Sequence, residues 1–340
     1  MADLPVLDIA PFINEPTSSA GVRFVDELRT VCHEIGFAHI IGHRVDPDLE
    51  RRLLAVTRQF FALPEDARRS LAIENSAAFR GYTVLGDERT ADGRDWRDQL
   101  DIGPEQEAPE TGHPGPAWLR LRGPNQWPAE LPHMAPTALS WLDEMNELGH
   151  AVMRALAVGL GQPIGFFDAF FDPADLHAKL IRYPAGERPT DQGVGRHHDS
   201  GLLTFILQDD VAGLEVELSG EMVSVEPLRG AYVMNLGAMM QAATNGYLRA
   251  TPHRVVAPAG TEDRLSIAFF FNPAFETVFE PIDLPPELSA RAEPDLVDLK
   301  GEAIHTLYGE NNLKVRLRTH PDVARRHYPD VLNSHTPSSP

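Results

Sequence analysis

The most constraining feature of this 340-residue chain is a series of short apolar segments between residues 177 and 273, separated by turn-forming residues. Short strands that recur with turn signals between them are typical of an all-β sandwich or barrel. The pattern favours a double-sheet jelly roll, whose cavity between the sheets can hold a metal. The expected strands are HAKLIRYP, GLLTFILQD, LEVEL, MVSVEP, AYVMNLG and RLSIAFFFNP.

Helical patterns flank this β region on both sides. Near the N-terminus, strands are expected at 4–8 and in FAHIIGH, with a helix between them, and Asp46-Pro47 suits the start of a second helix. A long helix with one apolar face from Leu139 to Leu156 should end at Gly161, and further helices are expected at 287–308 and 321–332. The predicted fold class is α+β, a double-stranded β-helix (jelly-roll) core flanked by N-terminal and C-terminal helices.

Composition excludes several classes of function. A formal net charge of −20 argues against nucleic acid, because binding to a polyanion rests on positive charge. Cys32 is the only cysteine, which excludes an intrachain disulfide, and its place in a helical pattern predicts a small buried apolar residue. The N-terminal residues carry no signal-peptide pattern and no apolar run reaches membrane-spanning length, so a cytoplasmic location is expected. Nothing in the sequence indicates an oligomeric state.

A candidate metal site begins with His197 and Asp199, two residues apart at the head of an apolar run. If they lie on one strand, alternation places both on the same side. A second histidine would complete the 2-His-1-carboxylate triad of non-haem Fe(II) oxygenases, and His253 in ATPHRVV is the candidate. By the same alternation His198 points the other way, toward substrate or neighbouring strands, and is assigned no ligation.

An anion-binding pair follows the second histidine. Arg264 and Ser266, in DRLSIAFFFNP, fall on one face of an expected strand. A guanidinium offers a planar two-pronged donor to a carboxylate, and a hydroxyl adds a third hydrogen bond. The pair therefore suits a ligand that carries a carboxylate.

At these residues the chain resembles the isopenicillin N synthase-like family of Fe(II)/2-oxoglutarate-dependent dioxygenases. The family motifs H-x-D-x-G-L-L-T, H-R-V and R-x-S with an aromatic run ending N-P appear here, in order, as HHDSGLLT, PHRVV and RLSIAFFFNP. PVLDIAPF, ELRTVCHEIGFAHIIGH, LRGPNQWP and LIRYP are also similar, so that the resemblance covers most of the chain. Several ordered motifs are far more specific than one.

The resemblance implies a dioxygenase that binds Fe(II) through His197, Asp199 and His253. It implies that Arg264, Ser266 and Tyr183 bind 2-oxoglutarate, with O2 as the second cosubstrate. Oxidative decarboxylation to succinate and CO2 would then drive oxidation of a small molecule, most simply by hydroxylation, with desaturation or cyclisation as variants. Family habit suggests a natural-product intermediate, as in antibiotic biosynthesis. The scarcity of cysteine also favours iron over a structural zinc.

Further residues are candidates for substrate contact. The irregular stretch 76–103 covers the active-site mouth in the family, which implicates Arg80, Tyr82, Trp96 and Gln99. Lys179 shares a strand face with Tyr183; if it points into the cavity it needs an acidic partner, such as a substrate carboxylate, and otherwise it is solvated. Asn235 is a candidate for contact with a ligand side chain or with substrate. Ala238 stands where the family often has an acidic residue, a difference expected to affect packing alone.

Three other functions remain open from the sequence. The R-x-S pair also suits a 2-oxoglutarate-independent oxidase or cyclase of the isopenicillin N synthase type, which binds a substrate carboxylate with it. An ethylene-forming enzyme would fragment 2-oxoglutarate itself. A non-catalytic jelly-roll binding protein would keep the barrel without turnover.

We expect one compact unit with five segments. They are an N-terminal region with the active-site mouth (1–116), a helical support (117–176), the jelly-roll core (177–275), a C-terminal helical cover (276–332) and a disordered tail (333–340).

Overall fold

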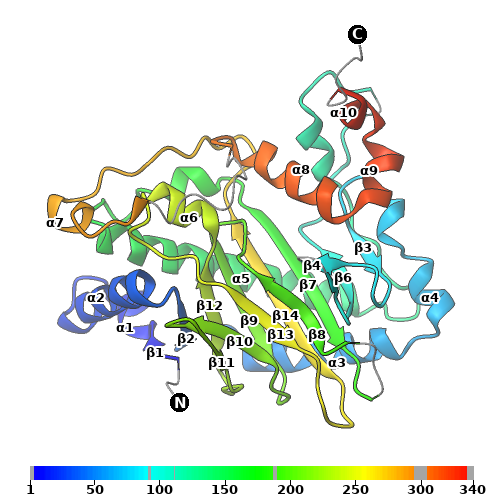
Figure 1. Cartoon of the computed structure of the whole chain (residues 1–340), viewed down its shortest axis with the longest axis horizontal. Coiled ribbons are helices and arrows are strands. Elements are labelled where there is room, and N and C mark those ends of the chain that lie inside the picture. The colour runs from blue at the N-terminus through cyan, green and yellow to red at the C-terminus, as the bar shows by residue number, and fades with distance from the viewer. Residues whose placement is uncertain (1–3, 91–92, 111, 187–189, 295–304, 335–340) are drawn as a thin grey trace.

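Two facing β-sheets form the centre of the molecule. The computed structural model describes residues 4–90, 93–110, 112–186, 190–294 and 305–334 (Figure 1). The large sheet has eight strands, in the spatial order β1 (Val6–Asp8), β2 (Phe37–Ile41), β12 (Tyr232–Leu236), β9 (Leu203–Gln208), β14 (Arg264–Asn272), β7 (Asp175–Tyr183), β6 (Asp98–Ile102) and β3 (Gly81–Thr83). The small sheet has four, in the order β11 (Glu221–Ser224), β10 (Leu214–Leu218), β13 (His253–Val256) and β8 (Gln192–His197).

The predicted jelly roll is therefore confirmed, with strands that the sequence patterns did not indicate. All six expected strands are present, but β8 and β13 are additional, and β3 and β6 come from the stretch that looked irregular. β1 and β2 join one edge of the large sheet, and β6 and β3 join the other. A two-stranded ribbon of β4 (Arg89–Thr90) and β5 (Gly93–Arg94) lies beside β8.

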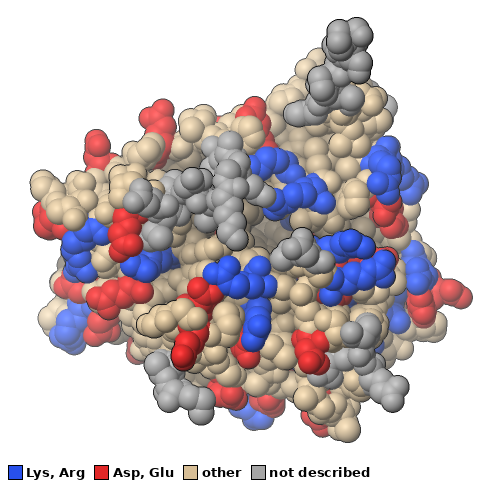
Figure 2. Space-filling view, viewed as in Figure 1, with Lys and Arg blue, Asp and Glu red and all other residues tan. Residues whose placement is uncertain are grey.

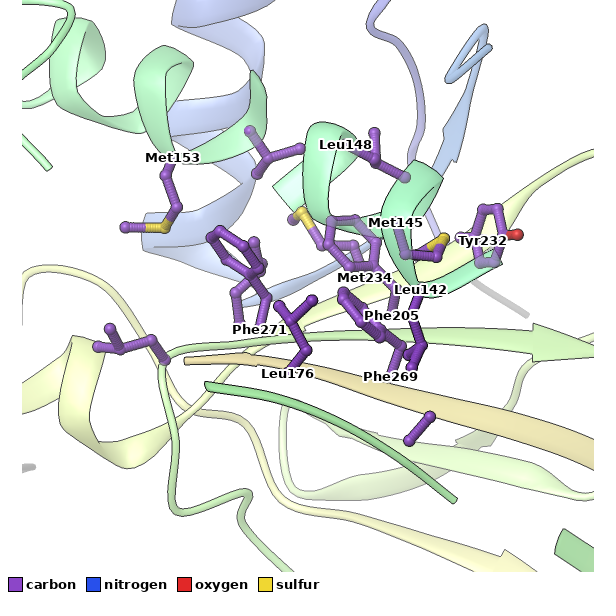
Figure 3. Packing of buried hydrophobic residues seen from close by; sticks show 14 of the residues in the cluster. Leu142, Met145, Leu148, Met153, Leu176, Phe205, Tyr232, Met234, Phe269 and Phe271 are labelled. Atoms are coloured by element: carbon purple, nitrogen blue, oxygen red, sulfur yellow. The ribbon is translucent and has the colours of Figure 1, made fainter. Parts of the chain in front are cut away.

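Helix α5 (Met134–Gly159) covers the outer face of the large sheet (Figure 3). Its Trp141 ring packs edge-on against Phe269 of β14, with ring centroids 5.6 Å apart. Phe205 and Phe271 lie in the same cluster and are fully buried. Burial of these apolar side chains stabilises the packing of the helix on the sheet by roughly 25 cal/mol per Å² of apolar area. As expected, the helix ends near Gly161, which takes a left-handed φ of 75°.

The N-terminal helices are α1 (Ala10–Asn14), α2 (Ser19–Glu34), α3 (Pro47–Ala62) and α4 (Glu65–Arg69). Of these, α2 and α3 pack against α5. Asp46 caps α3 by accepting a hydrogen bond from the Asp48 amide, as the Asp-Pro signal predicted. Cys32 is fully buried in α2, and burial raises the pKa of its thiol to about 12, which agrees with a packing role. Among the described residues, no helix combines the length and apolarity needed to span a membrane.

The C-terminal segment forms helices α7 (Pro286–Ser289), α8 (Tyr308–Thr319), α9 (Pro321–His327) and α10 (Pro329–Ser334), with α8 and α9 above β3 and β6 in Figure 1 and α10 beyond α9. The predicted helix at 287–308 was wrong where it can be compared, because helix ends at Ser289 and resumes at Tyr308; residues 295–304 lie outside the described residues. Helix at 321–332 is confirmed as α9 and α10. The expected disordered tail 333–340 was wrong at its first two residues, which belong to α10, and residues 335–340 lie outside the described residues.

The short elements η1 (Ile73–Asn75), η2 (Ala117–Leu121), η3 (Asp168–Phe171) and α6 (Ala238–Ala243) connect these layers.

Candidate metal centre

The three expected ligands, His197, Asp199 and His253, meet between the two sheets. Asp199 Oδ1 lies 3.7 Å from Nε2 of His197 and 3.8 Å from Nε2 of His253. One ligand atom from each residue lies within 4.8 Å of the other two. Two imidazole nitrogens and one carboxylate oxygen at this separation fit a single divalent first-row ion, with further positions open to other ligands.

The local fold brings these residues together in a different way from the one expected. His197 ends β8 and is the strand partner of His253 at the start of β13, so that the centroids of their rings are 4.3 Å apart. Asp199 lies in the connection between β8 and β9, outside either strand. The path of this connection, and not alternation within a strand, therefore places the carboxylate beside the imidazoles.

Backbone carbonyls set the proton positions of both histidines. Nδ1 of His197 is 2.8 Å from the Gly195 carbonyl oxygen, and Nδ1 of His253 is 3.2 Å from that of Thr251. Because a carbonyl oxygen only accepts, each Nδ1 carries the proton and each Nε2 presents its lone pair. Burial, helped by the nearby His197, lowers the pKa of His253 to about 4. Its imidazole is therefore neutral near pH 7, as metal ligation requires.

Asp199 is held by two donors that leave one of its oxygens free. The Thr204 hydroxyl donates to Oδ2 at 2.6 Å, and the Asn235 amide donates to the same oxygen at 2.8 Å. Burial raises the pKa of Asp199, but its close approach to His197 and His253 and the hydrogen bond from the Asn235 amide outweigh burial and hold that pKa well below its usual range. Oδ1 thus faces the imidazoles as a fixed carboxylate oxygen.

Removing both donors should weaken metal binding. In the double variant Thr204→Val, Asn235→Leu, we expect affinity for Mn(II), measured by anaerobic calorimetry, to fall roughly 10- to 100-fold, because Asp199 loses its orientation. Thr57→Val is the matched control, since the buried Thr57 hydroxyl has no hydrogen-bond partner among the described residues. Equal Mn(II) affinity in the double variant and in the control would show that the two donors do not position Asp199.

Arg264 lies on the inner face of β14 and is 1% exposed. Its Nη2 donates to Gln208 Oε1 at 2.8 Å, whereas Nε and Nη1 have no hydrogen-bond partner among the described residues. The guanidinium packs over the ring of Tyr183, 5.0 Å from its centroid. Ser266, two residues along β14, is the strand partner of Ile181. A buried cation with two unpaired nitrogens is costly alone, so this cradle fits a bound carboxylate.

Apolar residues of both sheets line the space between this cradle and the metal ligands. They form one buried cluster that includes Ile181, Tyr183, Val194, Leu214, Val216 and Val255. Val255 and Val194 are strand partners, two residues from His253 and three from His197. The arrangement suits a short ligand with a carboxylate at Arg264 and its other end at the metal.

A second group of inward-facing side chains is not fully covered by the small sheet. Ile206, Ala268, Phe270 and Lys179 point inward from the middle of the large sheet and remain partly exposed. Their outward-facing neighbours, among them Leu207, Ile267, Phe269 and Leu180, are buried. We call the space above these four residues the chamber. Its floor is apolar except at Lys179.

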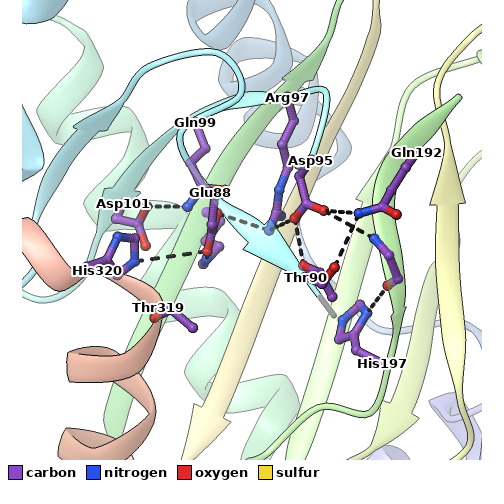
Figure 4. Close-up of polar contacts among 12 residues, drawn as sticks. Glu88, Thr90, Asp95, Arg97, Gln99, Asp101, Gln192, His197, Thr319 and His320 are labelled. Carbon is purple, nitrogen blue, oxygen red and sulfur yellow. Dashed lines mark hydrogen bonds and ion pairs between the residues drawn. The ribbon is translucent and has the colours of Figure 1, made fainter. Parts of the chain in front are cut away.

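A polar wall stands at the Lys179 side of the chamber, and Figure 4 shows its residues Glu88, Arg97 and Asp95. Lys179 Nζ donates to Glu88 Oε1 at 2.9 Å, and Glu88 pairs with Arg97, also at 2.9 Å. Arg97 contacts Asp95 at 3.1 Å, and Asp95 accepts from the Gly195 amide at 3.2 Å. A continuous series of polar contacts therefore links Gly195, whose carbonyl oxygen contacts His197, to the ion pair between Glu88 and Lys179. Within the described part of the chain, the acidic partner that Lys179 required is Glu88.

The other proposed contacts have varied surroundings. Tyr82 is the strand partner of Leu100, so it faces the outer side of the sheet, where its hydroxyl donates to Asp98 at 2.8 Å. Tyr82 therefore points away from the chamber, and its contact with substrate stays a prediction. Arg80 is buried against the Ile102 carbonyl and His177, which favours a structural role. His198 Nδ1 lies 2.7 Å from the Ala250 carbonyl oxygen, and the side chain adds no ligand to the metal group.

Gln99 faces inward on β6, donates to Asp101 at 2.7 Å and keeps a buried Oε1 without a partner among the described residues. The Trp96 indole nitrogen is also buried without a partner there. Asn235 contacts the metal-ligand candidate Asp199, which was one of the two contacts expected of it. Thr204 was assigned no role from the sequence, although it is the threonine of the HHDSGLLT motif. Glu88 and His320 lie in no motif from which a role could have been predicted.

His320, between α8 and α9, makes the wall sensitive to pH. Burial, opposed by the charge of Glu88, lowers the pKa of His320 from 6.5 to about 4. The unfolded chain therefore binds a proton between these values that the folded chain does not, and stability falls as the pH drops from about 7 to about 4, by at most roughly 3 kcal/mol. Urea unfolding with EDTA should show a smaller loss between pH 7 and pH 5 in His320→Gln than in the wild type. The same loss in both proteins would exclude this role for His320.

Charges on the face of Figure 2 are unevenly distributed. Lys and Arg side chains gather over α8 and near the middle of the face, although the chain as a whole is strongly acidic. α8 contributes Lys314, Arg316 and Arg318. Arg316 reaches Asp101 at 3.4 Å, which places this basic helix at the polar wall.

Comparisons with known proteins agree with this geometry. Residues 4–130 match the family described as non-haem dioxygenase in morphine synthesis N-terminal, and residues 175–273 match the 2OG-Fe(II) oxygenase superfamily. The chain is 33% identical to the 2-oxoglutarate-dependent dioxygenase frbJ of a Dothideomycetidae species, over 97% of this chain and 93% of the relative. It is 30% identical to a homoarginine-6-hydroxylase of Arabidopsis thaliana, over 93% and 88%. A full-length Neurospora crassa protein, solved in complex with alpha-KG, superposes with a TM-score of 0.74 and 27% identity, over 92% of this chain and 95% of the other.

Proposed function

Because this chain belongs to the Fe(II)/2-oxoglutarate-dependent dioxygenases of the isopenicillin N synthase-like superfamily, we propose that it hydroxylates a C–H bond of a small cytoplasmic metabolite. Succinate and CO2 are the coproducts. The names of the Dothideomycetidae and Arabidopsis proteins and the alpha-KG bound to the Neurospora protein support this proposal.

We assign each expected site residue a task. His197, Asp199 and His253 hold Fe(II), and Arg264 with Ser266 and Tyr183 holds the far carboxylate of 2-oxoglutarate. When bound, the ferrous ion and keto acid supply the oxidising chemistry, which belongs to the cofactor and not to the protein. The protein binds and orients the reactants, and the apolar cluster of both sheets excludes water from the space between the cradle and the ligands. Thr204 and Asn235 fix Asp199, and the carbonyls of Gly195 and Thr251 keep Nδ1 of each histidine protonated.

The observation that carries the proposal is the state of Arg264. A guanidinium with 1% exposure and two unpaired nitrogens needs an anion, and the nearby metal-ligand geometry makes a keto diacid a suitable one. A 2-oxoglutarate-independent oxidase would use the same arginine for a substrate carboxylate, so the keto acid itself has to be tested.

An anaerobic titration tests the proposal. Adding Fe(II) and then 2-oxoglutarate to the wild-type protein should produce the visible charge-transfer absorption of a chelated keto acid. Exposure to air should then release succinate, faster when a substrate is present. Bound iron without the absorption band would favour the oxidase, and absence of iron binding would favour a non-catalytic barrel.

A further inference from the structure

Lys179 is the point at which a charged side chain meets the chamber floor. It is the strand partner of Ala268, which in turn is the partner of Ile206. Asp101, its partner on β6, is fully buried, whereas the Lys179 side chain remains 13% exposed. A ligand in the chamber therefore meets the ammonium group before it meets the acids behind it.

The ammonium group has unused donors. Within the described part of the chain, Glu88 is the one hydrogen-bond partner of Lys179 Nζ, and an ammonium has three N–H groups. The acids behind it are already paired, Glu88 with Arg97 and Asp101 with Arg316. An incoming cation would be repelled by Lys179 and would find no unpaired acid. An incoming anion would gain a charge-assisted hydrogen bond.

We propose that Lys179 binds a carboxylate of the substrate, so that the enzyme oxidises a carboxylic acid with an apolar body. This deepens the function proposed above and rests on it. The body would lie over Ala268, Ile206 and Phe270, which form the apolar floor between Lys179 and the metal ligands. Two strand spacings separate β7 from β9, so this floor spans roughly 10 Å, which limits the substrate to a small molecule. The basic side chains of α8 at the wall would attract an anion toward the chamber (Figure 2).

A purely structural lysine makes a different prediction. If Lys179 only neutralises Glu88, then Lys179→Met and Glu88→Gln remove the same ion pair and should disturb the wall alike. If Lys179 binds the substrate, the two changes act in opposite directions, because Glu88 competes with the substrate for the ammonium group.

The test uses protein loaded anaerobically with Mn(II) and 2-oxoglutarate and titrated by calorimetry. The probes are phenylacetate, 3-phenylpropionate and 4-phenylbutyrate, each compared with its primary amide. We expect the wild type to bind at least one acid about ten times more tightly than its amide. Lys179→Met should lose this preference, and Glu88→Gln should bind the same acid more tightly than the wild type.

Two results would overturn the proposal. One is the absence of any acid preference in the wild type, including no binding of any probe, and the other is an unchanged preference in Lys179→Met. Thermal melts establish that both variants fold. The Fe(II) and 2-oxoglutarate absorption band is recorded separately: its absence in the wild type counts against the proposed function, whereas a normal band without acid preference counts against the role of Lys179 alone.

Discussion

Replacing His253 with alanine should abolish metal binding and turnover together. His253 supplies one of the three ligand atoms, and the remaining two would leave the ion under-coordinated in a buried site. Since the cofactor carries the chemistry, succinate formation should fall below ~10⁻³ of the wild-type rate. Anaerobic titration with Fe(II) and 2-oxoglutarate should give no charge-transfer band.

His113→Ala is the matched control, because His113 is exposed in the loop before η2. It should retain the band and the rate. A His253→Ala protein that melts like the wild type without metal, yet still binds Fe(II) with wild-type affinity, would show that the ligand set proposed here is wrong.

Replacing Arg264 with methionine should change cosubstrate binding and stability in opposite directions. Loss of a buried, hydrogen-bonded partner of a carboxylate typically costs about 3–5 kcal/mol, so the KM for 2-oxoglutarate should rise by a factor of ~10² or more. Without ligand, however, two guanidinium nitrogens are buried and unpaired. The apo variant should therefore melt at a higher temperature than the apo wild type.

Arg254→Met provides the control, since Arg254 is exposed on β13 and pairs with Glu215 at the surface. It should alter neither KM nor the melting temperature appreciably. Arg264→Lys keeps the charge but loses the two-pronged donor, so its KM should fall between those of the wild type and the methionine variant. An unchanged KM in Arg264→Met would place the 2-oxoglutarate carboxylate elsewhere.

The sequence was sufficient to predict the metal group and the jelly roll because both depend on local patterns. His197, Asp199 and His253 stand in short motifs, and strand signals surround them. The reason given for their convergence was nevertheless incomplete, since Asp199 lies in the connection after β8, where strand alternation does not apply.

The polar wall could not be predicted in this way. Glu88, Arg97 and Asp101 come from a stretch without periodicity, and Lys179 obtains its partner across 91 residues of sequence. The face on which Tyr82 lies could not be predicted either, because it depends on the register of β3 against β6, which becomes known only when both strands are recognised. The helix missed at α8 has no capping side chain at its N-terminus and few apolar positions, so local signals were weak.

The order of strands in the large sheet has a consequence for how the chain becomes stable. The core segment 175–273 supplies β12, β9, β14 and β7, but residues before 103 supply the strands on both flanks. Released alone, that segment would present two open backbone edges, which invite pairing with other chains. The first hundred residues of the chain thus cover both edges and protect the sheet against self-association, and the two family matches, although separate in sequence, describe parts of one sheet.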